Sequence, residues 1–334
     1  MDDKNIKPKF RIERQTLLLI IIFIVLMFFF SFTEKGFLTG RSISSMAFQL
    51  PEIGILSLAM MVTVMIGGIN LSVNATANLS AVLAGFFILR VMPQVTTEIQ
   101  SALLIGSTIL IALATGLLTG AINGYLVGHI GAPPILASLA SMTVFTGVAV
   151  GLTKGQTVTG FPEQIGLIGS QDFFKIPIPF LVFVGVTVIA YILLNHTTFG
   201  FKTRMLGTNP IAAKFSGIDN KAIIMKVFIF SGLLSSVAGV LVMSRTMSAA
   251  YQYGASTYVM LTILIYVLAG VVSGSGNVIN VFITVLILQI TSTGFHMLLA
   301  GVRGSSFFKD FVWGVLLILI FIINYFSRGK RNRE

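Results

Sequence analysis

Long apolar stretches alternate with short polar segments along almost the whole chain, and ten of these stretches are long enough to cross a bilayer. They cover about 16–32, 46–67, 75–92, 99–118, 135–152, 177–194, 222–243, 256–272, 278–298 and 307–326. A spanning helix needs roughly 20 apolar residues, whereas a spanning strand needs roughly 9 to 11 residues of alternating polarity. None of the stretches alternates, so their backbone groups must be hydrogen-bonded within helices. The pattern predicts an all-α, polytopic membrane protein with ten transmembrane helices.

The composition agrees with a chain that lies mostly in a bilayer. Of its 334 residues, 55% are hydrophobic and 10% are charged, and the mean hydropathy is +0.95. An ordinary soluble domain carries about 25% charged residues. The absence of cysteine excludes disulfides and thiolate chemistry. No segment has the composition of a separate soluble domain, so we expect a single transmembrane domain over 1–334.

The positive charges are distributed unevenly, and this distribution predicts the topology. The net charge is +11, and the Lys and Arg residues cluster in 1–15, 202–226 and 328–333. Positively charged segments tend to stay on the cytoplasmic side of a membrane. Ten spans place all three clusters there, whereas nine or eleven would not. We therefore expect cytoplasmic segments at 1–15, 196–221 and 327–334, and no nucleic-acid partner.

The segment 202–221 is a polar, basic island between two apolar stretches. Within it, Asn209 is a favourable N-cap, Pro210 fits the first position of a helix, and Gly217 is a typical helix stop. The pattern predicts a helix of about two turns between them. Because the island is expected in the cytoplasm, it is where the chain can meet a soluble partner.

Two apolar side chains, Ile211 and Phe215, lie at spacing i,i+4 and therefore share one face of this short helix. The small Ala212 and Ala213 lie beside them, and Lys214 is at the basic end. A helix of this kind can lie in the groove of a partner protein. The alternative is an ordered loop that only connects two membrane helices.

Two polar stretches without charge interrupt the apolar pattern, at 67–80 and 120–134. The first contains Gly67, Gly68, Asn70, Ser72 and Asn74, and the second contains Asn123 among several Gly and Pro residues. Polar backbone at membrane depth is tolerated only where it is buried in protein or lines a wet cavity. We expect both stretches to be helix breaks that form a translocation path or gate. For Asn70 and Asn74, helix packing through small polar residues is the alternative.

The residues that enzymes, metal sites and ion-coupled transporters need are missing from the sequence. His129, His196 and His296 are far apart, with no Asp or Glu at metal-ligand spacing. No nucleophile elbow, zinc-protease motif or P-loop is present, so we expect neither catalysis nor ATP binding by this chain. A transporter driven by protons or sodium needs ionisable side chains in mid-membrane to hold the coupling ion. The ten spans carry essentially none away from their ends. This leaves a passive pore, or a pump driven by a separate subunit.

Four separated motifs resemble one family of membrane proteins. The segment Gly67-Gly68-Ile69-Asn70-Leu71-Ser72-Val73 is similar to the G-G-I-D-L-S-V-G signature of bacterial ABC importer permeases for ribose, other simple sugars and autoinducer-2. The other motifs are Asn123-Gly124 with 132–139, Thr198-Phe199-Gly200, and the run from Gly207 through Asn209, Ala212, Ala213, Ser216 and Gly217 to Ile218. Their order and spacing cover most of the chain from about residue 50 to the end.

The resemblance implies a dimer of ten-helix permease subunits in the bacterial cytoplasmic (inner) membrane. Two ABC ATPase subunits would lie below the dimer, and an extracytoplasmic substrate-binding protein would lie above it, facing 153–175 and 244–256. The chain would bind no cofactor, and the partner ATPase would use ATP and Mg²⁺. The coupling helix on the ATPase would consist of Asn209, Pro210, Ile211, Ala212, Ala213, Lys214, Phe215, Ser216, Gly217 and Ile218.

Two positions depart from the family pattern. Asn70 stands where the family has Asp, and Asn74 stands where Gly usually follows. Losing a carboxylate removes charge from the gate while keeping hydrogen bonding, and the second permease subunit can be a copy of this chain or a different one. The expected function is an importer permease for a small polar solute, a simple sugar or a sugar-containing molecule. The alternatives are an importer permease for a nucleoside or other small metabolite and, ranked lower, a stand-alone channel or facilitator.

Overall fold

The computed structural model describes residues 13–91, 98–299 and 314, and this part of the chain is almost entirely helical. The long helices are α1 (Arg14–Thr33), α2 (Gly40–Val64), α3 (Val73–Val91), α4 (Glu98–Tyr125), α5 (Pro134–Thr153), α7 (Ile178–Asn195), α10 (Asn220–Thr246), α11 (Ala255–Leu268) and α12 (Val278–Leu298). The shorter ones are α6 (Glu163–Ser170), α8 (Thr198–Thr208), α9 (Pro210–Phe215) and the π-helical turn η2 (Leu126–Ile130). The strands are β1 (Val158–Thr159), β2 (Asp172–Phe173), β3 (Ile176–Pro177) and β4 (Ser248–Ala249).

Each predicted span in the described part of the chain corresponds to a helix, although the ends of some helices differ from the predicted bounds. Eight described helices are long and apolar enough to cross a bilayer, and α11 is a shorter apolar helix of 14 residues. The predicted span 278–298 coincides with α12, because Asn277 caps it by accepting a hydrogen bond from the Ile279 N–H at 2.9 Å. The tenth span, 307–326, lies outside the described residues except for Gly314. The all-α, polytopic membrane fold is confirmed.

The span predicted at 256–272 ends earlier in the structure. Helix α11 stops at Leu268, and Gly270 then adopts a left-handed backbone with φ +73°. Val272 and Ser275 pair across the turn that follows. The apolar pattern continues past the helix because Val271 and Val272 follow it, and hydrophobicity alone does not reveal the change of backbone direction.

The helix break predicted at 120–134 is wrong in its extent. Helix α4 continues to Tyr125 and is prolonged by η2, so the break is confined to the residues between Ile130 and Pro134, where Gly131 has φ +83°. By contrast, the break predicted at 67–80 is present as a non-helical connection between the end of α2 at Val64 and the start of α3 at Val73.

Four glycines at intervals of four residues explain why α4 continues. They are Gly116, Gly120, Gly124 and Gly128, and all of them lie against α10. A Cβ atom built on Gly116 would lie 2.4 Å from the carbonyl oxygen of Gly232, and one built on Gly120 would lie 2.5 Å from that of Phe228. Small residues on one helix face let two membrane helices approach until their backbones touch. These glycines therefore form a helix-packing face rather than a break.

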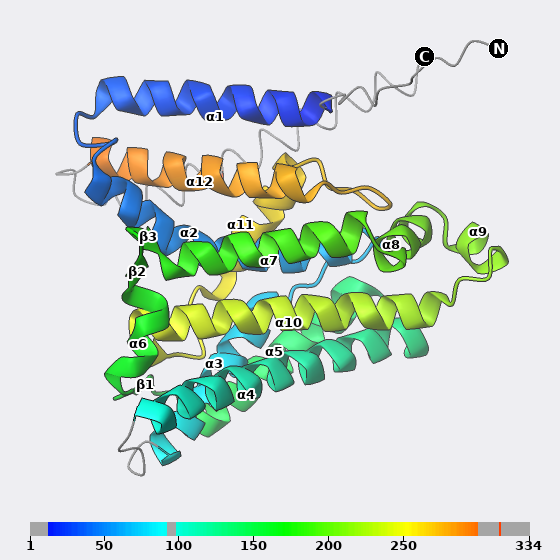
Figure 1. Cartoon of the computed structure of the whole chain (residues 1–334). Helices are drawn as coiled ribbons and strands as arrows, with labels where there is room; N and C mark the ends of the chain where they lie inside the picture. Colours follow the sequence, from blue (N-terminus) through cyan, green and yellow to red (C-terminus); the bar gives the residue numbers. More distant parts are fainter. Residues whose placement is uncertain (1–12, 92–97, 300–313, 315–334) are drawn as a thin grey trace, which may run out of the picture.

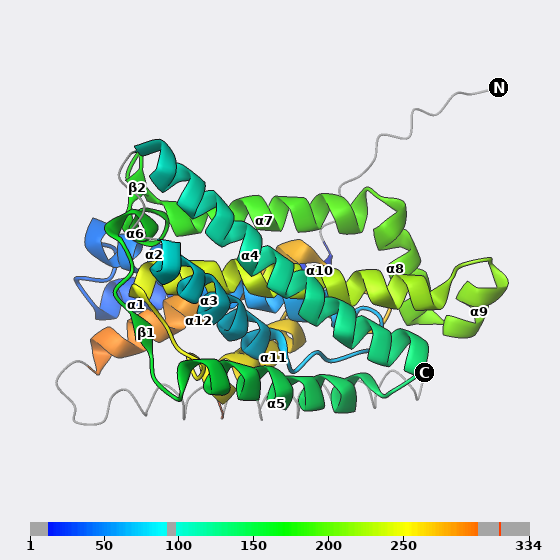
Figure 2. The ribbon, with the colours of Figure 1, turned by 90° about the horizontal axis from the view of Figure 1, so that it is seen from below.

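Helices α2 and α10 lie at the centre of the bundle. An 18-residue window of each is 78% buried, whereas the window of α1 is only 11% buried. Helix α1 packs along α12 on one side of the molecule (Figure 1). On the other side, α4 packs against α10 and α3, and α5 packs against α3 (Figure 2). Polar groups on α2 and α10 are therefore enclosed by protein.

The two ends of the bundle carry different elements. Helices α8 and α9 lie at one end, and α6 with the short strands lies at the other (Figures 1 and 2). Strands β1 and β4 pair antiparallel, with Val158 opposite Ala249. This pairing joins 153–175 to 244–256, two segments predicted to lie on the same, external side.

Candidate functional site

The short helix predicted in the basic island is present as α9. The side-chain oxygen of Asn209 accepts hydrogen bonds from the N–H groups of Ile211 and Ala212, both at 3.0 Å. Pro210 occupies the first helical position, and Gly217 follows the last turn with φ +77°. The cap, the proline and the left-handed glycine each restrict the backbone and favour the helical conformation of α9.

The apolar side chains of α9 point away from the bundle. Ile211 is 69% exposed and Phe215 is 88% exposed, whereas Ala213 and Ile218 are buried against the rest of the molecule. Lys214 is also exposed, as are Asn209, Pro210, Ala212, Ser216 and Gly217. Helix α9 projects from one end of the bundle (Figure 2). It therefore presents two apolar groups at the tip of the molecule.

Backbone contacts connect the helix before α9 to the end of α2. The Ser273 hydroxyl donates to the carbonyl oxygen of Gly207 at 2.6 Å, and the Gly274 N–H donates to the carbonyl oxygen of Met65 at 2.8 Å. A Cβ atom on Gly207 would lie 1.9 Å from the Met65 oxygen. We call this contact of Met65, Gly207, Ser273 and Gly274 the α2–α8 junction. Gly67 lies beside it, since a Cβ there would be 3.1 Å from the Ser273 hydroxyl.

Three of the predicted path residues form one buried hydrogen-bond network. The Asn70 side-chain oxygen accepts from the Ser72 hydroxyl at 2.7 Å and from the Ser72 N–H at 3.1 Å. The Asn70 amide donates to the Ser231 hydroxyl at 3.1 Å, and the Asn123 amide donates to the Ser72 hydroxyl at 2.9 Å. The buried side-chain oxygen of Asn123 has no partner in the described part of the chain. The network joins the α2–α3 connection to α4 and α10.

Gly68 lies next to this network, where the connection passes the start of α5. A Cβ atom on Gly68 would lie 3.0 Å from the Cβ of Pro134. The Leu71 N–H donates to the Ser138 hydroxyl at 3.1 Å, which fixes the same stretch to α5. Gly68, Asn70 and Ser72 are buried in protein, as predicted, whereas Gly67 is exposed.

Asn74 lies apart from the network and has a different partner. Its amide donates to the carbonyl oxygens of Tyr253 at 2.9 Å and Ala255 at 3.3 Å. Asn78, one turn further on, donates to the carbonyl oxygens of Tyr251 and Tyr253, both at 2.9 Å. The two amides hold the loop between β4 and α11 against α3. These contacts support the packing alternative for Asn74, and the gate formed by the Asn70 network remains a prediction.

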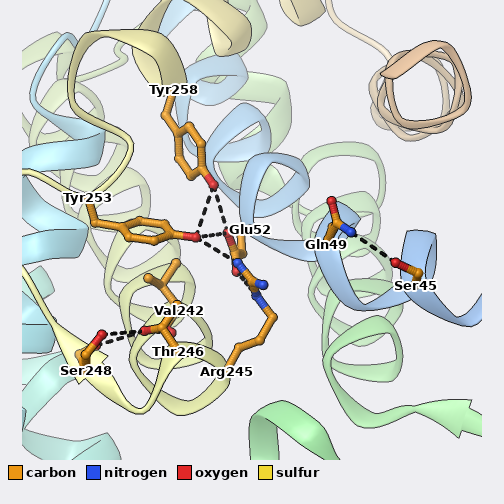
Figure 3. Close-up of polar contacts among 9 residues, drawn as sticks. All are labelled: Ser45, Gln49, Glu52, Val242, Arg245, Thr246, Ser248, Tyr253 and Tyr258. Atoms are coloured by element: carbon orange, nitrogen blue, oxygen red, sulfur yellow. Dashed lines mark hydrogen bonds and ion pairs between the residues drawn. The ribbon is translucent and has the colours of Figure 1, made fainter. Parts of the chain in front are cut away.

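Glu52 is the polar residue that the hydrophobic pattern missed. It lies inside α2 and is only 2% exposed, so the expectation that spans carry no ionisable group away from their ends is wrong. Its carboxylate forms an ion pair with Arg245 and accepts hydrogen bonds from the hydroxyls of Tyr258 at 2.9 Å and Tyr253 at 3.3 Å (Figure 3). A buried carboxylate is tolerated when it is paired and hydrogen-bonded. The sequence signal was a single acidic residue directly after Pro51 in an apolar stretch.

The comparison with known proteins agrees with this architecture. The family model described as "Branched-chain amino acid transport system / permease component" matches residues 42–321. The chain is 32% identical over 299 residues to the ribose import permease protein RbsC of Bacillus subtilis (strain 168), a match that covers 88% of each protein. It is 28% identical over 278 residues to the autoinducer 2 import system permease protein LsrD of Escherichia coli O9:H4 (strain HS), covering 81% of this chain and 79% of the relative.

No solved structure matches the chain. The family match begins at the start of α2 and runs beyond α12, so it includes the central helices, the buried network and α9. On this evidence the chain belongs to the family of branched-chain amino acid transport system permease components.

Proposed function

We propose that this chain is the permease subunit of an ATP-driven importer that carries a small neutral polar solute, a simple sugar or a sugar-containing molecule. The observation that carries the proposal is the exposure of Ile211 and Phe215, at 69% and 88%, on the preformed helix α9. Exposed apolar anchors on a short helix fit a groove on a partner protein. A cytoplasmic ATPase subunit of the importer is the partner of this kind.

The α2–α8 junction gives motion of α9 a route into the bundle. A displacement of α9 moves α8, and Gly207 at the end of α8 touches the Met65 carbonyl directly. The α2–α3 connection and its Asn70 network follow immediately after Met65. ATP-driven closure of the partners would thus bias the path between two arrangements. ATP and Mg²⁺ belong to the ATPase, because this chain has no P-loop.

The other partners of the proposed complex follow from the two ends of the bundle. An extracytoplasmic substrate-binding protein would contact the end that carries α6 and the paired strands β1 and β4. A second permease subunit, either a copy of this chain or a different chain, would complete the path. The complex would lie in the bacterial cytoplasmic membrane, with α9 on the cytoplasmic side.

The substrate class is inferred from the network and from the relatives. The two relatives are named for import of ribose and autoinducer 2. The Asn70, Ser72 and Asn123 side chains offer hydrogen bonds without charge, which suits a hydroxylated neutral solute. An amino acid carries two charges, for which this network has no partner. A nucleoside or another small neutral metabolite is the second candidate.

The proposal is tested by placing charges on α9. In the double variant Ile211→Asp, Phe215→Asp, we expect the chain to insert normally and to lose its ATPase subunit on affinity purification. Uptake into cells should fall to background. The matched control is Phe174→Asp, because Phe174 is 84% exposed and lies between β2 and β3 at the opposite end. That variant should retain the ATPase.

A stand-alone channel gives a different result in the same system. Liposomes that contain this chain without an ATPase should show no solute flux, whereas a channel would conduct. Retention of an ATP-hydrolysing complex by the double α9 variant would remove the basis of the proposal.

A further inference from the structure

A polar cavity of about 250 Å³ lies between α2, α11 and α12, where α10 ends. Its polar lining residues include Gln49, Glu52, Arg245, Tyr253, Tyr258 and Gln289. Figure 3 shows the side chains of Glu52, Arg245, Tyr253 and Tyr258 converging from α2, α10, the β4–α11 loop and α11. The cavity is at the end of the bundle opposite α9. It is separate from the Asn70 network and from the α2–α8 junction.

The geometry points to a binding site for a neutral, polyhydroxylated molecule of monosaccharide size in this cavity. This inference rests on the proposed function, since it assigns the sugar a place on the external half of the path. Drug-sized ligands occupy pockets of about 300–1,000 Å³. The smaller volume here restricts the occupant to a smaller molecule.

The charges within the cavity compensate one another. The Glu52 carboxylate is paired with the Arg245 guanidinium and accepts from both tyrosine hydroxyls. Burial, and then the negative charge of Glu52, raise the pKa of Tyr253 above its ordinary value, so its hydroxyl keeps its proton at neutral pH. A charged ligand would have to break the ion pair to find a counterion. A neutral ligand can enter while the pair stays intact.

Hydrogen-bonding groups of both kinds remain available around the ion pair. Arg245 has five N–H groups, of which one donates to Glu52 and one to the Tyr253 hydroxyl at 2.7 Å. The Gln289 amide donates to Thr293 at 3.3 Å, and the Gln289 carbonyl oxygen has no hydrogen bond within the described residues. The Gln49 amide likewise donates to the Ser45 hydroxyl at 3.1 Å, which leaves its carbonyl oxygen available. Since a sugar hydroxyl both donates and accepts, it can bridge such donors and acceptors.

Another part of the cavity wall is apolar. Leu261 of α11 and Leu288 of α12 line it together with the ring of Tyr258. Sugars combine hydroxyl groups with apolar C–H faces, so one face of the ring would contact this wall while its edge reaches the polar groups. Placed polar groups beside apolar side chains are typical of small-molecule sites.

Saturation-transfer NMR on the full-length chain purified in nanodiscs tests this site, with D-ribose as the probe and L-leucine as the charged comparison. We expect saturable ribose binding without ATP. Tyr258→Phe removes one hydroxyl and Gln289→Leu removes one amide, and each should weaken binding about 3- to 10-fold. Tyr266→Phe is the matched control, since Tyr266 lies on the same helix and does not line the cavity.

Two variants keep the test decisive if one of them fails to fold, because they alter different walls of the cavity. Ribose binding that neither variant weakens would overturn the site, and so would a complete lack of ribose binding or preferential binding of leucine. If the Glu52 cluster has only a structural role, the variants would change the melting temperature of the protein, and the unsubstituted protein would show no ribose binding. Loss of this site leaves ATPase copurification untouched, so its failure is distinguishable from failure of the proposed function.

Discussion

The Asn70 side chain makes three hydrogen bonds within its own protein and is also a candidate gate residue. Its oxygen accepts twice from Ser72 and its amide donates to Ser231, so it connects the α2–α3 connection to α10. In the family pattern this position carries Asp. An Asp could keep the bonds from Ser72, and the Ser231 hydroxyl could turn to donate to it.

The Asn70 network predicts different outcomes for two substitutions. Asn70→Leu removes all three hydrogen bonds and leaves buried polar groups unpaired, so we expect it to lower the unfolding free energy by about 1–3 kcal/mol. Asn70→Asp should lower the unfolding free energy less than Asn70→Leu does, because Asp can re-form the hydrogen bonds with Ser72 and Ser231. Thermal melting of the purified variants measures both effects.

The uptake rate of Asn70→Asp then distinguishes a gating role of Asn70 from a role in helix packing alone. If the network is a gate, a charge placed in it should change uptake and basal ATPase activity of the complex. Normal uptake and normal ATPase activity in a stable Asn70→Asp protein would leave only helix packing.

At the scale of elements, the contact between α4 and α10 includes direct approaches of one backbone to the other. Gly120 approaches the Phe228 carbonyl, and Gly232 approaches Gly116 so closely that a Cβ on it would lie 2.1 Å from the Gly116 oxygen. Since lipid is as apolar as leucine, close packing and not hydrophobic burial holds such helices together. The glycine spacing therefore determines how α4 lies on the central helix.

Gly120→Ala should separate these two helices. Its methyl group would lie 2.5 Å from the Phe228 oxygen, and overpacking of this kind costs about 1–3 kcal/mol. We expect a lower melting temperature of the purified chain. Gly106→Ala on the same helix is the control, because nothing lies within 4 Å of its added methyl group. Equal melting temperatures for the two variants would show that the close approach contributes no stability.

Structural features that depend on neighbouring residues could be predicted from the sequence. Contacts between residues far apart in the sequence could not. The cap at Asn209 and the start of α12 are local features, and both are confirmed. The glycines of α4 look like helix breakers until α10 lies against them. The ion pair of Glu52 joins residues 193 positions apart, and no spacing rule connects them.

At the scale of the whole molecule, α2 links the two proposed sites. Glu52, in the middle of α2, lines the cavity, and Met65, directly after the end of α2, lies at the α2–α8 junction. Their separation of 13 positions along the chain corresponds to about 20 Å of helix. Because α2 is buried along most of its length, it can transmit a displacement as one rigid element.

The α2–α8 junction is therefore the place where ATP hydrolysis by the partner can be uncoupled from opening of the translocation path. In Gly207→Ala, the added methyl group would lie 1.9 Å from the Met65 oxygen and 2.5 Å from the Gly274 nitrogen, so α8 must shift away from α2. We expect the variant to retain its ATPase subunit through an intact α9, to hydrolyse ATP, and to lose most of its uptake. Uptake and ATP hydrolysis measured on the same proteoliposomes give the ratio that reports coupling. Gly185→Ala on α7, where the methyl group meets nothing within 4 Å, should keep the normal ratio. A normal ratio in Gly207→Ala as well would mean that α9 drives the path by another route.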